Sequence, residues 1–196
     1  MLEDLQSLMR RILADNGFRL SMGITGFPSG IEVILQTKCF SDRELNEMEY
    51  KMLDLVNGER QSRVIRPMIF NEQIADVARG HSRDMVKRNF VDHLNPDGMN
   101  CHQRLSEAGI YPLMCGENIA KHMSIDTAHI GLMNSLGHRQ NILDEEFTHI
   151  GIGIVQGRDR YLLITQNFTR DDRFLRFFKT AGIPTKVAGK RYCGGT

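Results

Sequence analysis

The sequence has no long apolar run and no excess of charge of one sign. No stretch of its 196 residues approaches the ~20 apolar residues of a membrane-spanning helix, so no transmembrane segment is expected. The 25 lysines and arginines are scattered among 24 acids, giving a net charge of +1. Such a chain cannot neutralise many phosphates along a duplex, and neither a nucleic-acid partner nor a membrane-surface role is expected.

The sequence as written also has no recognisable export signal and few cysteines. Its first residues, MLEDLQSLMRRILADNG, mix acids and arginines into the apolar positions, unlike the unbroken apolar core of a signal peptide. We therefore expect a cytoplasmic protein, or an extracellular one if a leader is missing from this sequence. The four cysteines are sparse, form no CxxC pair and are expected to be mostly reduced, with Cys101 and Cys115 the only pair inside the candidate domain.

The composition is that of an ordinary globular protein, with 41% hydrophobic and 25% charged residues. The length fits one domain with attachments. Apolar residues at spacings of three or four predict a helix over residues 1–15, and a turn-rich segment at 26–30 predicts a hairpin of 17–25 with 31–37. We assign residues 1–43 to an N-terminal attachment, 44–169 to the domain and 170–196 to a C-terminal tail. The attachment either covers the domain or docks a partner, and the first is favoured.

Four helices are expected inside the domain. Ser41 and Glu44 form a capping box that starts the first helix. The second begins near Asn71 and carries His81 on its apolar stripe, which favours a hydrogen-bonded core histidine over a metal ligand. The third covers residues 101–108, and the fourth runs from Ser124 to Ser135.

Two strands are expected to close the domain as an antiparallel hairpin. Residues 150–155 alternate branched apolar side chains with glycine, so one face of this strand is bare and lets a neighbour approach closely. Residues 161–168 return after a polar turn. Helices followed by an antiparallel hairpin indicate an α+β layered architecture.

Four collinear segments carry a family resemblance. They are HSRDM with NFVDH at 81–93, NPDG at 95–98, GENIA at 116–120 and GHRQNIL at 137–143, followed by IGIG at 150–153 and TQNF at 165–168. Together they resemble the CAP superfamily of cysteine-rich secretory, antigen-five and pathogenesis-related-one proteins, most closely its bacterial SCP-like branch. The resemblance implies a three-layer α-β-α sandwich with an antiparallel sheet over residues 44–169.

The same resemblance implies a cleft with histidines and acids. His93, Glu117 and His138 match three of the family's four cleft positions, and Ser135 stands where eukaryotic relatives carry the second acid. Two imidazoles and a carboxylate form a plausible open site for weakly bound zinc or another divalent metal. Alternatively, the histidines only hydrogen-bond to Glu117 and the backbone. Glu117 itself has either a catalytic role or a structural one as an ion-pair partner of Arg139.

The leading functional hypothesis is a non-enzymatic binding or interaction module whose cleft holds a small ligand, a lipid, a metal or a protein partner. No catalytic residue is assigned, because Ser135 cannot replace the missing carboxylate. The first alternative is a metal-assisted hydrolase, a peptidase or esterase, with Glu117 as base. The second is a structural domain tethered by its N-terminal attachment.

Overall fold

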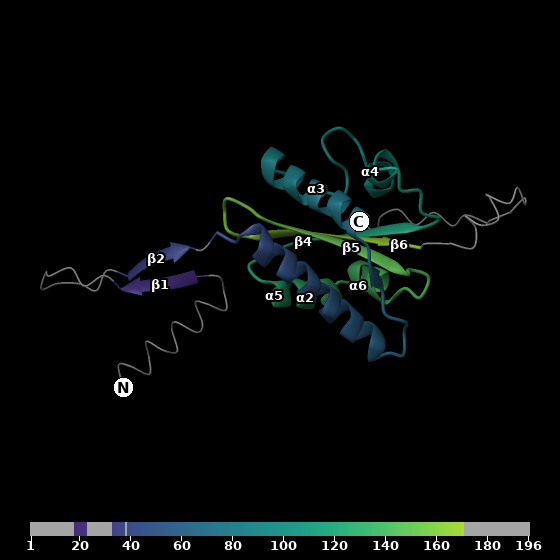
Figure 1. Ribbon diagram of the computed structural model, residues 1–196, viewed down its shortest axis with the longest axis horizontal. Coiled ribbons are helices and arrows are strands. Elements are labelled where there is room, and N and C mark those ends of the chain that lie inside the picture. The colour runs from purple at the N-terminus through teal and green to yellow at the C-terminus, as the bar shows by residue number, and fades with distance from the viewer. Residues whose placement is uncertain (1–17, 23–32, 38, 171–196) are drawn as a thin grey trace, which may run out of the picture.

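The computed structural model describes residues 18–22, 33–37 and 39–170 (Figure 1). The helices among these residues are α2 (Asp42–Gln61), α3 (Glu72–Arg88), α4 (Cys101–Glu107), α5 (Ile125–Asn134) and α6 (Leu136–Leu143). The strands are β1 (Phe18–Met22), β2 (Val33–Thr37), β3 (Ile69–Phe70), β4 (Cys115–His122), β5 (His149–Gln156) and β6 (Leu162–Thr169). None of these helices is both long and apolar enough to cross a membrane.

The domain is built on a four-stranded mixed sheet with the order β3-β5-β6-β4. β5 and β6 pair antiparallel, from His149 opposite Thr169 to Gln156 opposite Leu162, which confirms the predicted closing hairpin. β4 adds to the other side of β6, also antiparallel, and is an edge strand. The short β3 joins β5 in parallel, an addition to the antiparallel sheet that was expected.

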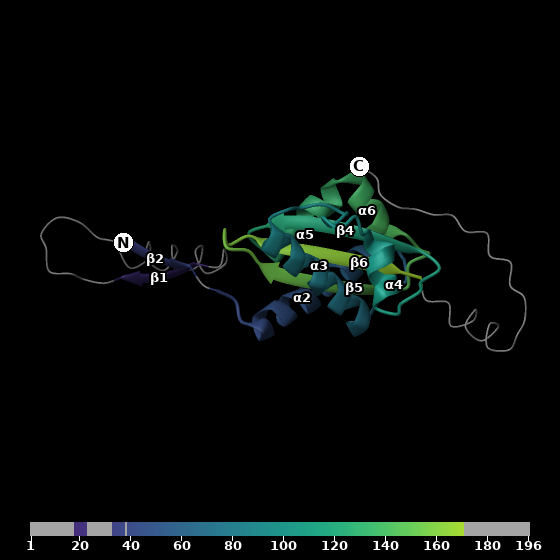
Figure 2. The same cartoon turned by 90° about the horizontal axis from the view of Figure 1, so that it is seen from above.

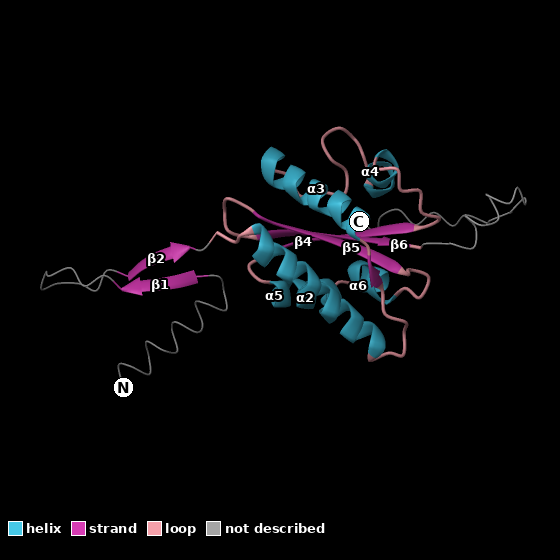
Figure 3. Ribbon diagram, in the orientation of Figure 1, coloured by secondary structure: helices cyan, strands magenta, loops and turns pink. Residues whose placement is uncertain are grey.

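The helices form two layers, one on each face of this sheet. α3 and α4 lie on one face, and α2, α5 and α6 lie on the other (Figure 3). The view from above shows α3 lying along β5 and β6 (Figure 2). This arrangement confirms the predicted three-layer α-β-α sandwich.

The main core lies between the sheet and the layer of α2, α5 and α6. Alternate residues of β5 and β6 point to this side, because successive side chains of a strand face opposite ways. The fully buried members of this cluster include Met52, Val56, Ile142, Ile150, Ile152, Ile164 and Phe168. A smaller cluster of Ile74, Cys101, Leu105 and Cys115 fills the opposite face beneath α4.

The glycines of β5 allow α3 to pack directly on the sheet. A Cβ atom at Gly153 would lie 2.0 Å from the backbone nitrogen of Arg79, and one at Gly151 would lie 2.3 Å from that of Ala75. No side chain fits in such a space. The close neighbour expected on the bare face of this strand is therefore the backbone of α3.

The helix starts follow the expected capping chemistry. Ser41 and Glu44 form the predicted capping box, and the Asn71 and Ser124 side chains accept hydrogen bonds from the first turns of α3 and α5. At the other end of α2, the fully buried Arg60 donates to the carbonyl oxygens of Ile142 and Asp144. These bonds hold the C-terminal end of α6 against α2.

Outside the domain, β1 and β2 pair antiparallel, as the predicted hairpin requires. The helix predicted for residues 1–15, the turn at 26–30 and the tail from 171 onward lie outside the described residues. The division into attachment, domain and tail therefore stays a prediction.

Candidate functional site

The candidate site lies at the outer edge of β4, where the two helical layers meet the sheet. Cys115 and Glu117 are two positions apart on this strand, so their side chains point to the same face, toward α4. Asn118 points to the opposite face, toward α6. Neighbouring residues of one strand thus reach both layers.

Glu117 is held by a buried ion pair with Arg104 of α4. Arg104 Nη2 donates to Glu117 Oε2 over 2.5 Å, and the two side chains are 8% and 4% exposed. Arg104 Nη1 also donates to the carbonyl oxygens of His93 and Met99. The predicted partner, Arg139, does not take this place, since its guanidinium donates to the carbonyl oxygen of Met133.

His93 reaches Glu117 from the loop that follows α3. The helix ends at Asn89 in the left-handed conformation, with φ of 55°, which turns the chain out of the helix. His93 Nδ1 lies 2.8 Å from Glu117 Oε1, and the imidazole remains 40% exposed. The structure therefore brings His93 and Glu117 into direct contact.

His81 supports this loop from below. Its side chain is buried, and Nε2 lies 3.0 Å from the carbonyl oxygen of Asp92. The ring also packs near Phe90, with centroids 5.8 Å apart. His81 is therefore a hydrogen-bonded core residue that positions the segment leading to His93.

His138 comes from α6, on the other side of the sheet edge. Asn118 Nδ2 donates to the carbonyl oxygen of His138 over 3.0 Å. Asn141 Nδ2 donates to Asn118 Oδ1 over 2.9 Å and to the carbonyl oxygen of Glu117. The asparagines of the GEN and GHRQN segments therefore bind α6 to β4 and set the position of His138.

The two histidines have opposite electrostatic environments. The hydrogen bond to Glu117 raises the pKa of His93, an effect that outweighs its partial burial. Burial lowers the pKa of His138, and the nearby positive charge of His93 lowers it further. Glu117 thus acts on the pKa of His93, whereas burial is the main influence on the pKa of His138.

A three-ligand metal site does not fit this arrangement. Both carboxylate oxygens of Glu117 already accept hydrogen bonds from Arg104 and His93. Over residues 39–170, no group of three or more His, Cys, Asp or Glu side chains is arranged to hold a metal ion. Only the imidazoles of His93 and His138 remain as donors.

Ser135 lies at the junction of two helices. It joins α5 to α6, and its side chain makes no capping hydrogen bond to α6. Its backbone carbonyl accepts from Arg139 N. Its assignment to the cleft stays a prediction.

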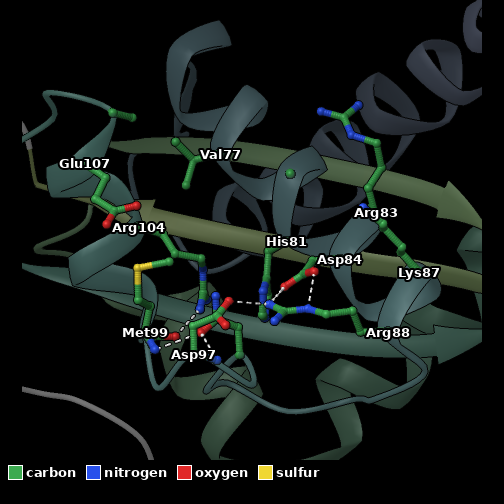
Figure 4. A pocket seen from close by; sticks show the side chains of 13 residues that line it. Val77, His81, Arg83, Asp84, Lys87, Arg88, Asp97, Met99, Arg104 and Glu107 are labelled. Atoms are coloured by element: carbon green, nitrogen blue, oxygen red, sulfur yellow. Dashed lines mark hydrogen bonds and ion pairs between the residues drawn. The ribbon is translucent and has the colours of Figure 1, made fainter.

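Beside the site, a shallow groove of about 730 Å³ runs between α3 and α4 (Figure 4). Val77 and His81 line it from α3, and Arg104 and Glu107 line it from α4. His81 and Arg104 thus contribute to both the groove and the residues around Glu117.

Arg104 is the member of this site that the sequence analysis missed. The signal available was its place on the inner face of a short helix, at the spacing of the buried residues Cys101 and Leu105. An arginine in such a position requires a buried partner. Nothing in the local sequence indicates that this partner is Glu117.

Two proteins of Bacillus subtilis are similar to this chain in sequence. A 38% identical segment of 109 residues matches the uncharacterized protein YkwD of Bacillus subtilis, covering 55% of this chain and 42% of the relative. A 32% identical segment of 142 residues matches the uncharacterized membrane protein YlbC of the same organism, covering 70% of this chain and 40% of the relative. The chain thus spans less than half the length of these relatives.

Solved structures and a family model agree with the architecture. An extracellular protein containing an SCP domain from Bacillus anthracis is 33% identical, with a TM-score of 0.60 over 68% of this chain and 45% of that one. An outer surface protein of Borrelia burgdorferi, 13% identical, shares the fold with a TM-score of 0.61 over 64% of this chain and 94% of that one. The model of the cysteine-rich secretory protein family matches residues 53–168. Since that match includes His93, Glu117 and His138, the domain around this site belongs to the cysteine-rich secretory protein, or CAP, family.

Proposed function

We propose that the site around His93, Glu117 and His138 is a ligand-binding cleft without hydrolytic activity of its own. The observation that carries this proposal is the full engagement of Glu117 by Arg104 and His93. A general base must be free to accept a proton from water or substrate. A carboxylate whose two oxygens already accept hydrogen bonds can take up a proton or a metal ion only if one of these bonds is broken.

The chemistry of the cleft favours a ligand with a hydrogen-bond acceptor. His93 uses Nδ1 for Glu117, which leaves Nε2 of the partly exposed ring to meet a ligand. Its raised pKa favours the protonated ring, in which this nitrogen is a cationic donor suited to a carboxylate or carbonyl oxygen.

Exposed apolar side chains adjoin both histidines. Val91 and Leu94 flank His93 in the chain, and Leu136 precedes His138 by two residues. Sites for small ligands combine an apolar lining with a few polar groups, and these side chains supply an apolar part beside the histidines. We therefore propose a small amphipathic ligand, with an acceptor oxygen at His93 and an apolar part against these residues.

Calorimetric titration with octanoate tests this proposal, with octanol as the matched probe that lacks the carboxylate. We expect octanoate to bind more tightly at pH 6 than at pH 8, because protonated His93 is the better donor. In the His93→Ala variant, this pH dependence should disappear. Equal affinity for octanoate and octanol in the wild-type protein would contradict the assigned role of His93.

Zinc titration tests the metal form of the same cleft. We expect weak binding that His93→Ala and His138→Ala each remove, and that Glu117→Gln does not weaken. The metal-assisted hydrolase requires the opposite, with Glu117 essential both for affinity and for turnover in the presence of zinc. Peptidase and esterase assays that detect an activity lost in a folded Glu117→Gln variant would favour the hydrolase.

The place of action is also part of the proposal. The Bacillus anthracis relative is an extracellular protein, which supports an extracellular role for this domain over the cytoplasmic one expected from the sequence. Detection of the protein in the medium or on the cell surface, with a cytoplasmic enzyme as lysis control, tests this location. If the protein is found only in the fraction that contains the cytoplasmic enzyme, the extracellular location is wrong.

A further inference from the structure

Two cysteines lie together beneath the site and take no part in the proposed binding of ligand. Cys101 is the first residue of α4, and Cys115 is the first residue of β4. Both are free thiols, 7% and 8% exposed, and both belong to the small apolar cluster with Ile74 and Leu105. The chain from one to the other includes all of α4.

The sheet register places both thiols next to the buried ion pair. Glu117 is directly opposite Asn167 of β6, so these two side chains share a face with Cys115. The Cys101 thiol donates to Asn167 Oδ1 over 3.3 Å. Cys101 is therefore held at the same edge of the sheet as Cys115 and Glu117.

The two thiols lie in the same small buried cluster and interact with each other. This interaction raises the pKa of Cys101 and lowers that of Cys115, so Cys115 is the sulfur that forms a thiolate more readily. A thiolate beside a second thiol is the arrangement from which disulfide exchange proceeds.

We propose that Cys101 and Cys115 form a dithiol site that small disulfides, such as oxidised glutathione, convert reversibly to a disulfide bond. The Cys115 thiolate attacks one sulfur of the small disulfide, forming a mixed disulfide and releasing one small thiolate. Cys101 then loses its proton to solvent and attacks the Cys115 sulfur, forming the bond between the two residues and releasing the second thiolate. Two protein thiols are oxidised, and one small disulfide is reduced to two thiols.

This bond would tie the start of α4 to the start of β4, next to the Arg104–Glu117 pair. The cross-link restricts mainly the unfolded chain, and this restriction is modest because the closed loop is short. The oxidised protein should melt about 5–10 °C above the reduced one. An effect of this disulfide bond on ligand affinity rests on the function proposed above.

The experiment uses the full chain with Cys39→Ser and Cys193→Ser, which leaves only the pair. The reduced protein is exposed to oxidised glutathione, its free thiols are counted, and its peptides are mapped without reduction. We expect both thiols to be lost together and one pair of peptides to be joined by a disulfide bond between Cys101 and Cys115. Dithiothreitol should restore both free thiols. Further substitution of Cys101→Ser or Cys115→Ser should leave a single thiol that can only form a mixed disulfide with glutathione.

Three outcomes would overturn the proposal. One is glutathione attached separately to both cysteines, and another is a bond between two chains. The third is a folded protein that keeps both thiols while the same protein in denaturant loses them. Octanoate titration of the oxidised and reduced forms separates this proposal from the previous one, because failure of octanoate to bind either form rejects the ligand cleft and leaves the mapped disulfide unaffected.

Discussion

Arg104 and Glu117 form an ion pair across the α4–β4 contact, with both side chains almost completely removed from solvent. Removal of two charges from water costs several kcal/mol for each ion, and the attraction between them offsets this cost only with good geometry and further hydrogen bonds. Arg104 supplies such bonds to the carbonyl oxygens of His93 and Met99. The main effect of the pair is therefore to hold Glu117 and the His93 loop in position, and its net contribution to the stability of the fold is smaller.

We expect Arg104→Leu to lower the free energy of unfolding by about 3–5 kcal/mol, because it leaves the Glu117 carboxylate buried without its partner. Urea denaturation followed by circular dichroism measures this change. The matched control is Arg43→Gln, which breaks an exposed pair with Glu47 and should cost less than about 1 kcal/mol. Equal effects of the two variants would show that the Arg104 pair is not buried in solution.

Glu117→Gln should move the pKa values of the two cleft histidines in opposite directions. The pKa of His93 should fall, because the hydrogen bond that raises it is weakened. The pKa of His138 should rise, because a less protonated His93 repels its proton less. Proton NMR titration of the imidazole signals measures both values. A shift of both pKa values in the same direction would mean that the rings do not interact as described.

His81 should make the fold less stable in acid. Burial lowers its pKa in the folded protein, whereas the unfolded chain takes up a proton near pH 6.5. Because the unfolded state then binds more protons, stability falls as the pH drops below about 6.5. The wild-type protein should thus lose more stability between pH 7.5 and 5.5 than the His81→Phe variant. Parallel losses, measured by urea denaturation at both pH values, would reject this role.

His93 should have the opposite effect on how the stability of the fold changes with pH. Its pKa is raised on folding, so its contribution is fully present below about pH 6.5 and disappears as the pH rises through the raised value. In a His93→Gln variant, this alkaline loss should be absent. Denaturation at pH 6 and pH 8.5 measures it, and a loss of equal size in both proteins would assign the alkaline effect to another group.

Gly153→Ala should destabilise the domain by about 3 kcal/mol, because the new Cβ would meet the α3 backbone. Gly80→Ala is the control within α3 itself, since a Cβ there meets nothing within 4 Å. Alanine is preferred to glycine inside a helix, so this control should stabilise the protein by about 0.5–1 kcal/mol. Melting curves of both variants test the comparison, and a neutral Gly153→Ala would contradict the close packing of α3 on β5.

The elements with local signals were predictable from the sequence. Caps at Ser41, Asn71 and Ser124 set the starts of α2, α3 and α5, and glycine alternation predicted β5 and a close approach to its bare face, although not that α3 makes it. The sandwich followed from the family resemblance. The caps are contacts between residues close in the sequence, and the glycines of β5 recur with the fixed period of a strand.

The elements that depend on distant partners were not predicted. The GENIA segment forms the edge strand β4 because β6 pairs with it along its full length, and no local alternation marks it. α6 begins directly after α5, without a side-chain cap, and is held by Asn118 and Arg60 from elsewhere in the chain. The choice of Arg104 over Arg139 as the partner of Glu117 likewise depends on how α4 folds over the sheet.

The edge position of β4 has a thermodynamic consequence. His93 belongs to the layer of α3 and α4, and His138 belongs to α6 in the opposite layer. A ligand that contacts both histidines therefore connects the two helical layers. Such a ligand binds only the assembled sandwich and stabilises it by mass action, by about 2.7 kcal/mol at one hundred times its dissociation constant. Ligands for this cleft can therefore be found by screening compound collections for delayed unfolding on heating.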